Sequence, residues 1–572
     1  MEKINKIRSF FSNYKLDGYL IPKNDEFFGE YVPEDKDNLK FITNFSGSFG
    51  FTIILKKENF LFVDGRYTTQ AEIQSGKNFK IITIPKKLPY QVFPKKFLRI
   101  GFDPKLHTES FFKRFFIYSK CMLVPININF VNAIKPKKKM FKINKFFTLN
   151  KIHTGLSAGK KINHLTSYLK KEKIDLQLIT SVENISWLLN IRGKDSEYAP
   201  TNNCFLLLDK NKKINLFVEP LKINNQFKSK FKNIKFNNIN NLKYFLSKIN
   251  KKTIQIDSNT CSIFLKNILN KKNKIIEKKD LIYALKAAKT NVEILNTKKA
   301  HITDGAALTK FLFWVKRNYL KKKITELSAE NKLYSFRKKN KNFKSLSFPT
   351  ISGTRSNGAI IHYRATKKTN KILRKGDIYL VDSGGQYNYG TTDVTRTISL
   401  NNNNKKIKSI FTRVLKGHIA VASFNLKKNT KGDEIDKVAR KPLKQINLDY
   451  AHGTGHGVGY FLNVHEGPQG ISKRNKIKFV KGMIVSNEPG FYKKGKFGIR
   501  IENLIYVKKN NNKLKFENLT LAPIDKNLID KSLLSHKEVL WINDYHKKVF
   551  NSLKKFMDKS DLKDLKKDCS FI

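Results

Sequence analysis

Apolar and polar residues alternate along the chain in blocks that predict several α/β units. Residues 17–22 (DGYLIP) are typical of a buried strand, and residues 50–67 predict a β-hairpin, because two apolar runs flank a short polar turn. Residues 166–179 and 286–319 instead contain helical spacing of apolar positions. From residue 376 to about residue 516 the pattern favours strands, and the remainder returns to a mostly helical pattern.

These blocks divide the 572 residues into four parts, since one hydrophobic core does not serve a chain of this length. A lysine-rich joint near residues 136–151 separates the first two blocks, whose similar texture suggests a shared fold. We predict a first domain at residues 1–140, a second at 141–285, a third at 286–515 and a helical extension at 516–572.

The stretch HGTGHGVGYFLNVHEGP, residues 452–468, concentrates three histidines and five glycines. That many glycines would weaken a helix or a strand. We therefore predict a tight backbone loop around a small ligand, with imidazoles directed at it. The alternative is a glycine-rich turn whose histidines are merely solvated.

Two aspartates flank a turn-rich segment within residues 376–400, which predict a strand, a turn and a second strand. We take the turn to centre on Tyr387 and Asn388. Asp382 and Asp393 would then lie directly opposite each other, with Cβ atoms about 5 Å apart. Two buried carboxylates that close repel unless one takes a proton, and a divalent cation removes that conflict. Apolar runs beside both argue against two exposed strand ends.

Two glutamates belong to a similar apolar context. Glu488 ends the apolar run of GMIVSNEPGFY, and Glu502 is predicted inside the strand of FGIRIENLIYV. A glutamate inside an apolar strand requires a partner. Arg500, two residues earlier on the same face, could be that partner in a purely structural salt bridge.

Four carboxylates and a histidine-rich loop within residues 382–502 suit a pair of divalent transition ions. Hard oxygen donors with one or two imidazoles favour Mn²⁺ over metals that prefer thiolates. A single Mg²⁺ is the weaker alternative, because Mg²⁺ rarely recruits histidine. Two ions can together polarise a carbonyl and supply a nucleophile.

The formal charge of +67 has two interpretations. A polyanion such as nucleic acid could be the partner, but the charge is spread along the chain and no aromatic-and-basic recognition motif occurs. We favour compositional drift, since the abundant Lys, Asn, Ile and Phe all have AT-rich codons. No apolar run reaches a membrane span, and the charged start lacks the centre of a signal peptide. Four widely spaced cysteines suit a reducing compartment, so we expect a cytoplasmic protein.

Many short motifs together resemble one known family. The earlier ones are DGYLIPKNDEFFGEYVP, NFSGSFG, FVDGRYTTQA and ISWLLNIRGKD. The later ones are GAIIHY, DSGGQY, TTDVTRT, HGTGHGVG, NVHEGP, NEPGFY, GIRIEN, LTLAPIDKNLID and YHKKV. With them the sequence resembles the Xaa-Pro aminopeptidases, the aminopeptidase P group of the pita-bread metallopeptidases, over nearly its whole length.

The resemblance implies an α/β protein with two creatinase-like N-terminal domains and an α+β pita-bread catalytic domain with a short helical extension. It implies a dinuclear metal site whose ligands are Asp382, Asp393, His456, Glu488 and Glu502. Asp393 and Glu502 would bridge the ions, and Glu488 would also act as general base. Three further histidines would line the substrate site and stabilise the tetrahedral intermediate, namely His362, His452 and His465.

The implied reaction releases the first residue of a peptide whose second residue is proline, and family members are typically homodimers. A prolidase-type dipeptidase is the nearest alternative, although the chain length and the C-terminal extension argue against it. A binding protein with a dead site is a more distant one, although all five ligands are present. The sequence departs from the family at Tyr389, where an acidic residue is frequent.

Overall fold

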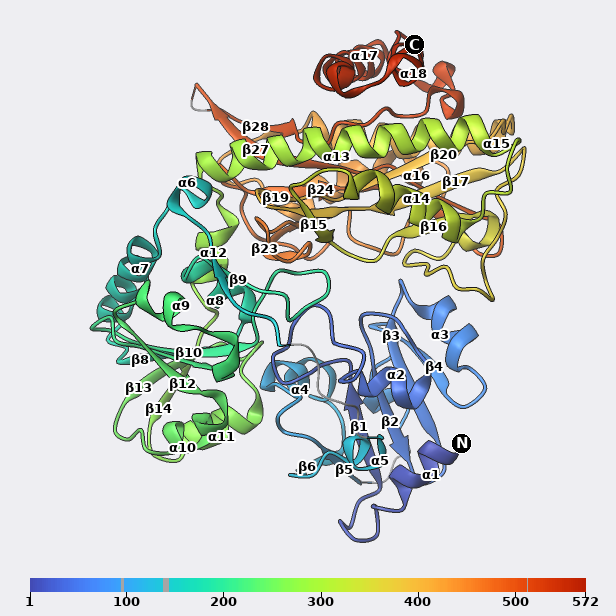
Figure 1. Cartoon of the computed structure of the whole chain (residues 1–572). Coiled ribbons are helices and arrows are strands. Elements are labelled where there is room, and N and C mark those ends of the chain that lie inside the picture. The colour runs from blue at the N-terminus through green and yellow to red at the C-terminus, as the bar shows by residue number, and fades with distance from the viewer. Residues whose placement is uncertain (94–96, 137–142, 512) are drawn as a thin grey trace. The chain divides into compact units, whose positions relative to one another are not determined.

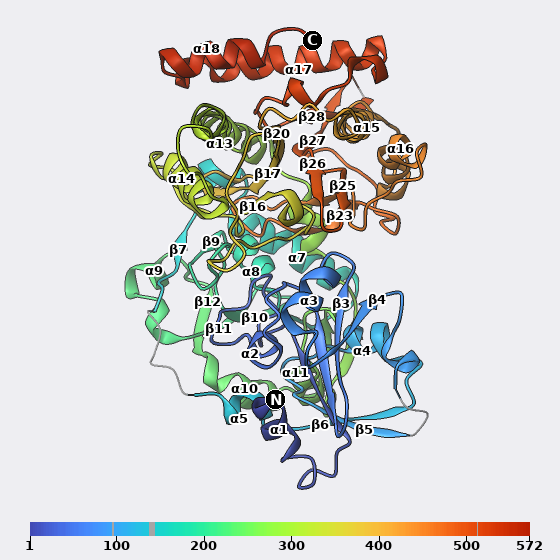
Figure 2. The same ribbon diagram turned by 90° about the vertical axis from the view of Figure 1, so that its right-hand side faces the viewer.

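The computed structural model describes residues 1–93, 97–136, 143–511 and 513–572, which form two compact units (Figures 1 and 2). Unit 1 comprises residues 1–151 and 156–283, and unit 2 comprises residues 152–155 and 284–572. The boundary predicted at residues 140/141 and most of the lysine-rich KPKKKM segment lie outside the described residues.

Two six-stranded mixed sheets form the centre of unit 1. The first has the order β4-β3-β2-β1-β5-β6 and the second the order β12-β11-β10-β8-β13-β14. The strands of the first are β1 (Gly18–Pro22), β2 (Phe51–Leu55), β3 (Asn59–Asp64), β4 (Lys80–Ile84), β5 (Leu98–Phe102) and β6 (Cys121–Pro125). Those of the second are β8 (Leu176–Ile179), β10 (Cys204–Asp209), β11 (Ile214–Val218), β12 (Ile234–Asn238), β13 (Thr253–Ile256) and β14 (Lys274–Glu277).

The two sheets have the same topology. In each, two antiparallel pairings at the centre are flanked by parallel pairings. The expected strand at 17–22, the hairpin at 50–67 and the shared fold of the first two blocks are therefore confirmed. The helices of unit 1 are α1 (Glu2–Arg8), α2 (Asn38–Thr43), α3 (Thr68–Ser75), α4 (Glu109–Phe115), α5 (Phe130–Ile134), α7 (Ala158–Lys171), α8 (Val182–Leu188), α9 (Asn225–Ser229), α10 (Leu242–Ser247) and α11 (Ile263–Asn270).

The helix expected at residues 166–179 is only half correct. α7 ends at Lys171, and Lys173 adopts a left-handed φ of 56° that turns the chain away from the helix. Residues Leu176–Ile179 then form β8, which is buried on both faces. A strand buried on both faces lacks the alternation that distinguishes it from an apolar helix segment.

Unit 2 carries antiparallel sheets and several helices, four of which form two packed pairs. The long α13 (Asn291–Asn318) confirms the helix expected after residue 286 and begins with a capping box of Thr290 and Glu293. It packs against α14 (Glu326–Lys338), and α15 (Lys405–Ala422) packs against α16 (Gly432–Lys444), as Figure 2 shows. These last two helices interrupt the region expected to be strand-rich from residue 376 onward.

Three of the sheets of unit 2 lie around the predicted site. β16 (Ile351–Thr354), β17 (Ile378–Ser383) and β20 (Val394–Ser399) form one, and β25 (Gly490–Lys493) and β26 (Phe497–Arg500) form a hairpin. The largest has the order β21-β28-β27-β24-β22-β23. Its strands are β21 (Asn425–Leu426), β22 (Gly455–Gly457), β23 (Glu466–Ile471), β24 (Ile484–Asn487), β27 (Asn503–Asn510) and β28 (Lys513–Asn518). A small sheet of β15 (Phe343–Leu346), β18 (Gly385–Tyr387) and β19 (Gly390–Thr391) completes the unit.

The C-terminal residues form α17 (His536–Leu553) and α18 (Lys559–Asp568), which confirms the expected helical end. Both pack against α13 (Figure 1). Arg317 of α13 makes ion pairs with Asp561 (2.8 Å) and Asp564 (2.5 Å) of α18. Among the described residues, every helix is either too short or too polar to span a bilayer.

Candidate metal centre

The predicted strands that carry the two aspartates are present, but their register differs from the expectation. β17 pairs with β20 so that Asp382 lies opposite Thr395, and the turn comprises Asn388 and Tyr389. Asp393 lies two residues before Thr395, just ahead of β20. Because side chains alternate along a strand, a displacement of two positions leaves Asp382 and Asp393 on the same face as diagonal neighbours. The prediction that Asp382 and Asp393 lie directly opposite each other is therefore wrong.

Both glutamates lie where strands end. Glu488 follows β24, and its backbone N–H donates to the carbonyl of Thr454 at 2.8 Å. Glu502 lies between β26 and β27 rather than inside a strand. The strand expected there is broken because the chain leaves the β25–β26 hairpin and joins the six-stranded sheet at this point. The break directs the buried Glu502 toward β20, where the hydroxyl of Thr395 donates to it at 2.7 Å.

The glycines around His456 allow close contact between strands rather than a loop alone. Residues 455–457 form β22, so part of the stretch expected to be a loop is a strand. A Cβ on Gly455 would lie 1.9 Å from the carbonyl oxygen of Ser486, and one on Gly457 would lie 2.1 Å from that of Glu466. No larger residue fits at either position.

Asp393, His456 and Glu502 converge, each offering a ligand atom within 4.8 Å of the others. The Nε2 atom of His456 lies 3.5 Å from Asp393 and 3.5 Å from Glu488. Its Nδ1–H donates to the carbonyl of Gly457 at 2.9 Å, which fixes the tautomer and leaves the Nε2 lone pair directed at the carboxylates. That arrangement is typical of a metal-binding histidine.

Asp382 joins the group through Arg500, which is almost fully buried. The guanidinium donates to Oδ2 of Asp382 at 2.6 Å, to the hydroxyl of Thr395 at 3.0 Å and to that of Tyr492 at 2.5 Å. Arg500 is therefore the ion-pair partner of Asp382. The alternative of a purely structural salt bridge between Arg500 and Glu502 is wrong. The other oxygen of Asp382 is buried and has no hydrogen-bond partner among the described residues.

The buried carboxylates of this group carry more negative charge than the neighbouring arginine can neutralise. Burial, and then the carboxylates of Asp393, Glu488 and Asp382, raise the pKa of Glu502 well above its usual range. Burial and Asp382 likewise raise the pKa of Glu488, against His456 and Arg500. Four carboxylates facing one guanidinium require either bound protons or bound cations. The donor set of oxygens with one imidazole fits divalent transition ions.

The three histidines that were predicted to line the substrate site differ in exposure and in contacts. The ring of His465 is exposed, and its centroid lies 4.2 Å from that of His456. His362 is half-buried in the segment between β16 and β17. The Nδ1–H of His452 donates to the carbonyl of Gly453 at 2.7 Å, and its Nε2 lies 3.0 Å from the Tyr492 hydroxyl. Its two ring nitrogens are thus held by protein atoms.

A buried ion cluster that the sequence did not reveal holds the segment carrying His465. The next residue, Glu466, contacts the ammonium groups of Lys286, at 3.3 Å, and Lys289. All three side chains are about 1% exposed. The lysines precede α13 by a few residues, so this contact depends on the fold and leaves no local signal in the sequence.

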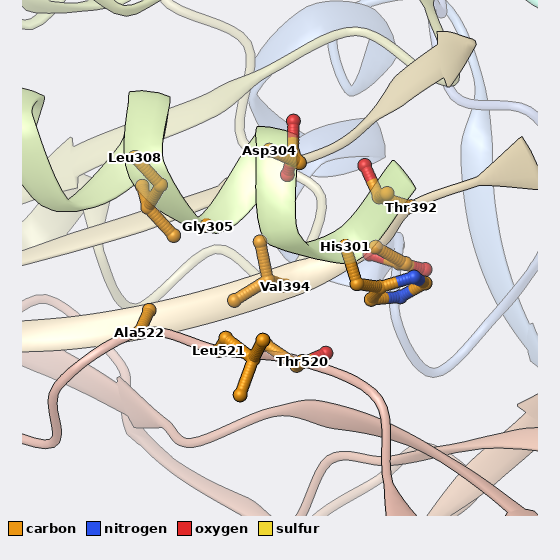
Figure 3. A pocket seen from close by; sticks show the side chains of 10 residues that line it. His301, Asp304, Gly305, Leu308, Thr392, Val394, Thr520, Leu521 and Ala522 are labelled. Carbon is orange, nitrogen blue, oxygen red and sulfur yellow. The ribbon is translucent and has the colours of Figure 1, made fainter. Parts of the chain in front are cut away.

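A small pocket lies behind Asp393, between α13 and the segment 520–522 (Figure 3). Figure 3 shows His301 and Asp304 of α13 on one side of it and Leu521 and Ala522 on the other. Among the five predicted ligands only Asp393 borders it. We therefore do not assign it to the substrate.

Comparison of the chain with known proteins identifies its family. Models of four regions match: "Creatinase/Prolidase N-terminal domain" at residues 3–126 and again at 136–293, "Metallopeptidase family M24" at 296–509, and "C-terminal region of peptidase_M24" at 512–572. Xaa-Pro aminopeptidase 1 of Dictyostelium discoideum is 36% identical over 98% of this chain and 94% of its own length. The chain belongs to the Xaa-Pro aminopeptidases of metallopeptidase family M24.

Other relatives agree. A probable Xaa-Pro aminopeptidase P of Laccaria bicolor is 36% identical over 100% of this chain and 93% of its own length. The crystal structure of X-prolyl aminopeptidase from Caenorhabditis elegans, described as a cytosolic enzyme with a di-nuclear active site, superimposes with a TM-score of 0.94. It is 31% identical and is covered over 99% of its length. The prolidase from Pyrococcus furiosus covers 62% of this chain, with a TM-score of 0.51 and 23% identity, and shares the fold alone. The fold expected from the resemblance is confirmed, as is the Xaa-Pro aminopeptidase family.

Proposed function

We propose that the protein is a metal-dependent Xaa-Pro aminopeptidase that hydrolyses the bond between a first residue and a following proline. The carrying observation is the buried group of Asp393, His456 and Glu502, with Glu488 and Asp382 beside it, in a chain similar to Xaa-Pro aminopeptidases over its full length. Such a bond needs a dedicated enzyme, because the imide nitrogen of proline carries no hydrogen and its ring fixes φ.

In this proposal two divalent ions, with Mn²⁺ as the expected metal, would be held by Asp382, Asp393, His456, Glu488 and Glu502. The ions would supply Lewis acidity for the scissile carbonyl and a water of lowered pKa. Support comes from the raised pKa of Glu502 and from the oxygen of Asp382 that has no partner among the described residues.

The side chains of the protein perform the proton transfers and the orientation. Glu488, positioned by the Ser486 hydroxyl at 3.1 Å, takes the proton of the attacking water and delivers it to the departing nitrogen. His465 and His362 donate hydrogen bonds to the scissile carbonyl oxygen as it gains negative charge. His452 lines the same site, and its contact with Tyr492 connects it to Arg500 and so to Asp382.

The same ligands would serve a prolidase, so chain architecture and peptide length separate the two activities. We expect a tripeptide with proline in the second position to be cleaved, and the dipeptide X-Pro to be a poor substrate. The corresponding tripeptide with alanine in the second position should lose at least about 10-fold in kcat/KM, because an apolar pocket discriminates by shape and contact area. The measurement is product release from the three peptides at equal concentration. Equal rates for the proline and alanine tripeptides would contradict the proposal.

The carboxylates also predict how stability depends on pH. The raised pKa of Glu488 and of Glu502 means that the metal-free folded state holds protons that the unfolded chain, with a usual glutamate pKa of 4.5, releases. The free energy of unfolding of the metal-free protein therefore falls as pH rises above that value toward the folded-state pKa. Bound cations replace those protons and remove the loss.

The gain in melting temperature on adding Mn²⁺ should thus increase from about pH 5 to about pH 8. Thermal unfolding with Mn²⁺ or with a chelator, at several pH values, measures it. Because only the difference between the two conditions is compared, titrations elsewhere in the chain cancel. A gain that is constant or shrinks with pH would contradict the assignment of these carboxylates to the metals.

We also propose a homodimer and a cytoplasmic location. The dimer rests on the family resemblance alone. The location is supported by the C. elegans relative, described as cytosolic, and by four cysteines that form no disulfide. We keep the division at residues 1–140, 141–285, 286–515 and 516–572 as a proposal, noting that the last boundary falls within β28.

A further inference from the structure

A buried carboxylate outside the metal centre organises the segment that carries His362. We name residues 355–377, between β16 and β17, the His362 loop; most of it lacks helix and strand structure. Glu326, the first residue of α14, is fully buried beneath it. The loop therefore contacts a buried carboxyl group in addition to the apolar cluster of Ile351, Tyr363 and Leu380.

The carboxylate of Glu326 accepts hydrogen bonds from the residue just before this segment and from three positions within it. Oε1 accepts from the backbone N–H of Thr354 at 2.8 Å. Oε2 accepts from the amide of Asn357, the hydroxyl of Tyr363 and the backbone N–H of Lys371, each at 2.9 Å. The N–H of Glu326 itself donates to the carbonyl of Lys371 at 2.9 Å. One side chain thus connects the end of β16 to three positions spread along the loop.

The groups that contact the Glu326 carboxylate are hydrogen-bond donors. Burial raises the pKa of Glu326, against the hydrogen bonds from Thr354 and Lys371. A fully buried carboxylate is tolerated only where several donors satisfy it, and hydrogen bonds to a charged acceptor are roughly twice as strong as neutral ones. Glutamine has nearly the same shape, but its NH₂ group would face one of these donors.

His362 is covalently adjacent to Tyr363, whose hydroxyl reaches Glu326. On the N-terminal side of His362, Asn357 donates a hydrogen bond to Glu326. Its amide also contacts the Tyr363 hydroxyl at 2.8 Å. The only residues between these two anchors are Gly358 to His362. A catalytic donor must be held within about 0.5 Å of its productive position.

We propose that Glu326 is a positioning residue for catalysis, which holds His362 at the substrate by fixing the loop on both sides of it. The inference rests on the proposed function, because it takes His362 as a donor to the substrate. Glu326 touches neither substrate nor metal, and acts only through the loop.

The test is a double-mutant cycle between Glu326→Gln and His362→Ala in the full-length, metal-loaded protein. We expect Glu326→Gln to lower kcat by about 10- to 100-fold, as misplacement of a catalytic group does, with KM and metal content nearly unchanged. In the His362→Ala background the same substitution should lower kcat by less than about 3-fold, because the group that it positions is absent. Tyr363→Phe, which removes one donor and keeps the ring, should give a smaller loss with the same non-additivity. It also serves if Glu326→Gln fails to fold.

Asp525→Asn is the matched control. Asp525 is also buried and accepts two backbone N–H groups, from Ser399 at 2.8 Å and Asn527 at 3.1 Å. Its Oδ1 also lies 3.5 Å from the ammonium group of Lys316, and these three partners lie outside the His362 loop. It should lower the melting temperature and leave the kcat of the folded enzyme unchanged in both backgrounds. Equal fold-losses from Glu326→Gln with and without His362 would overturn this inference and leave the proposed function intact. Wild-type kcat in His362→Ala would overturn both the assignment of His362 and the inference.

Discussion

Replacing Asp393 by Asn, or Glu502 by Gln, is expected to abolish hydrolysis of X-Pro peptides and to lower the metal content of a protein that still folds. Asp393 and Glu502 both offer an oxygen to the position that His456 faces. Each substitution keeps the shape of the side chain while removing its charge and presenting an NH₂ group to a cation. The loss of several kcal/mol of transition-state stabilisation corresponds to at least about 10³-fold in kcat/KM.

The folded state should tolerate these two substitutions. Burial and neighbouring carboxylates raise the pKa of Glu502 well above its usual range, so the metal-free fold favours a neutral group there. Glu517→Gln is a suitable control, because Glu517 belongs to the same unit and its carboxylate forms ion pairs with Lys298, Lys508 and Lys548. It should keep full activity and full metal content. Normal turnover and full occupancy in Asp393→Asn and Glu502→Gln together would refute the assignment.

Replacing His362 or His465 by Ala is expected to lower kcat about 10²-fold, the usual effect of losing a transition-state hydrogen-bond donor or proton-transfer group. Metal stoichiometry should be unchanged, because both histidines are assigned to the substrate and not to the metals. Steady-state kinetics and metal analysis of the same preparations measure both quantities.

His536→Ala provides the control, because His536 is an exposed histidine in α17, outside the metal centre. It should behave as the unmodified protein does. If His362→Ala or His465→Ala loses an ion, that histidine is a ligand and the division between metal and substrate residues is wrong.

The strands and the neighbourhood of the predicted ligands could be read from the sequence because both depend on local patterns. β17 is an apolar run with Asp382 near its end, β20 is an alternating run that directly follows Asp393, and Glu488 directly follows β24. The register of β17 and β20 could not be read. Several positions between Gly384 and Gly390 can form the turn, and moving its centre by one residue changes the partner of Asp382 from Asp393 to Thr395.

The polar contacts that support the site were not predictable for a different reason. Arg500 is close in sequence to Glu502 but binds Asp382, 118 positions away, because the break between β26 and β27 turns Glu502 toward Thr395. Glu326 and the lysines that bind Glu466 are likewise far in sequence from the histidines they support. A partner chosen by the tertiary fold leaves no spacing pattern.

The central claim is that Asp382, Asp393, His456, Glu488 and Glu502 hold two divalent ions. Anomalous diffraction from crystals of the full-length protein loaded with Mn²⁺, measured on both sides of the manganese absorption edge, tests it most directly. We predict two anomalous peaks per chain among these five side chains, with Asp393 and Glu502 each contacting both and Asp382 contacting one. A single peak, or peaks coordinated by other residues, would contradict the account.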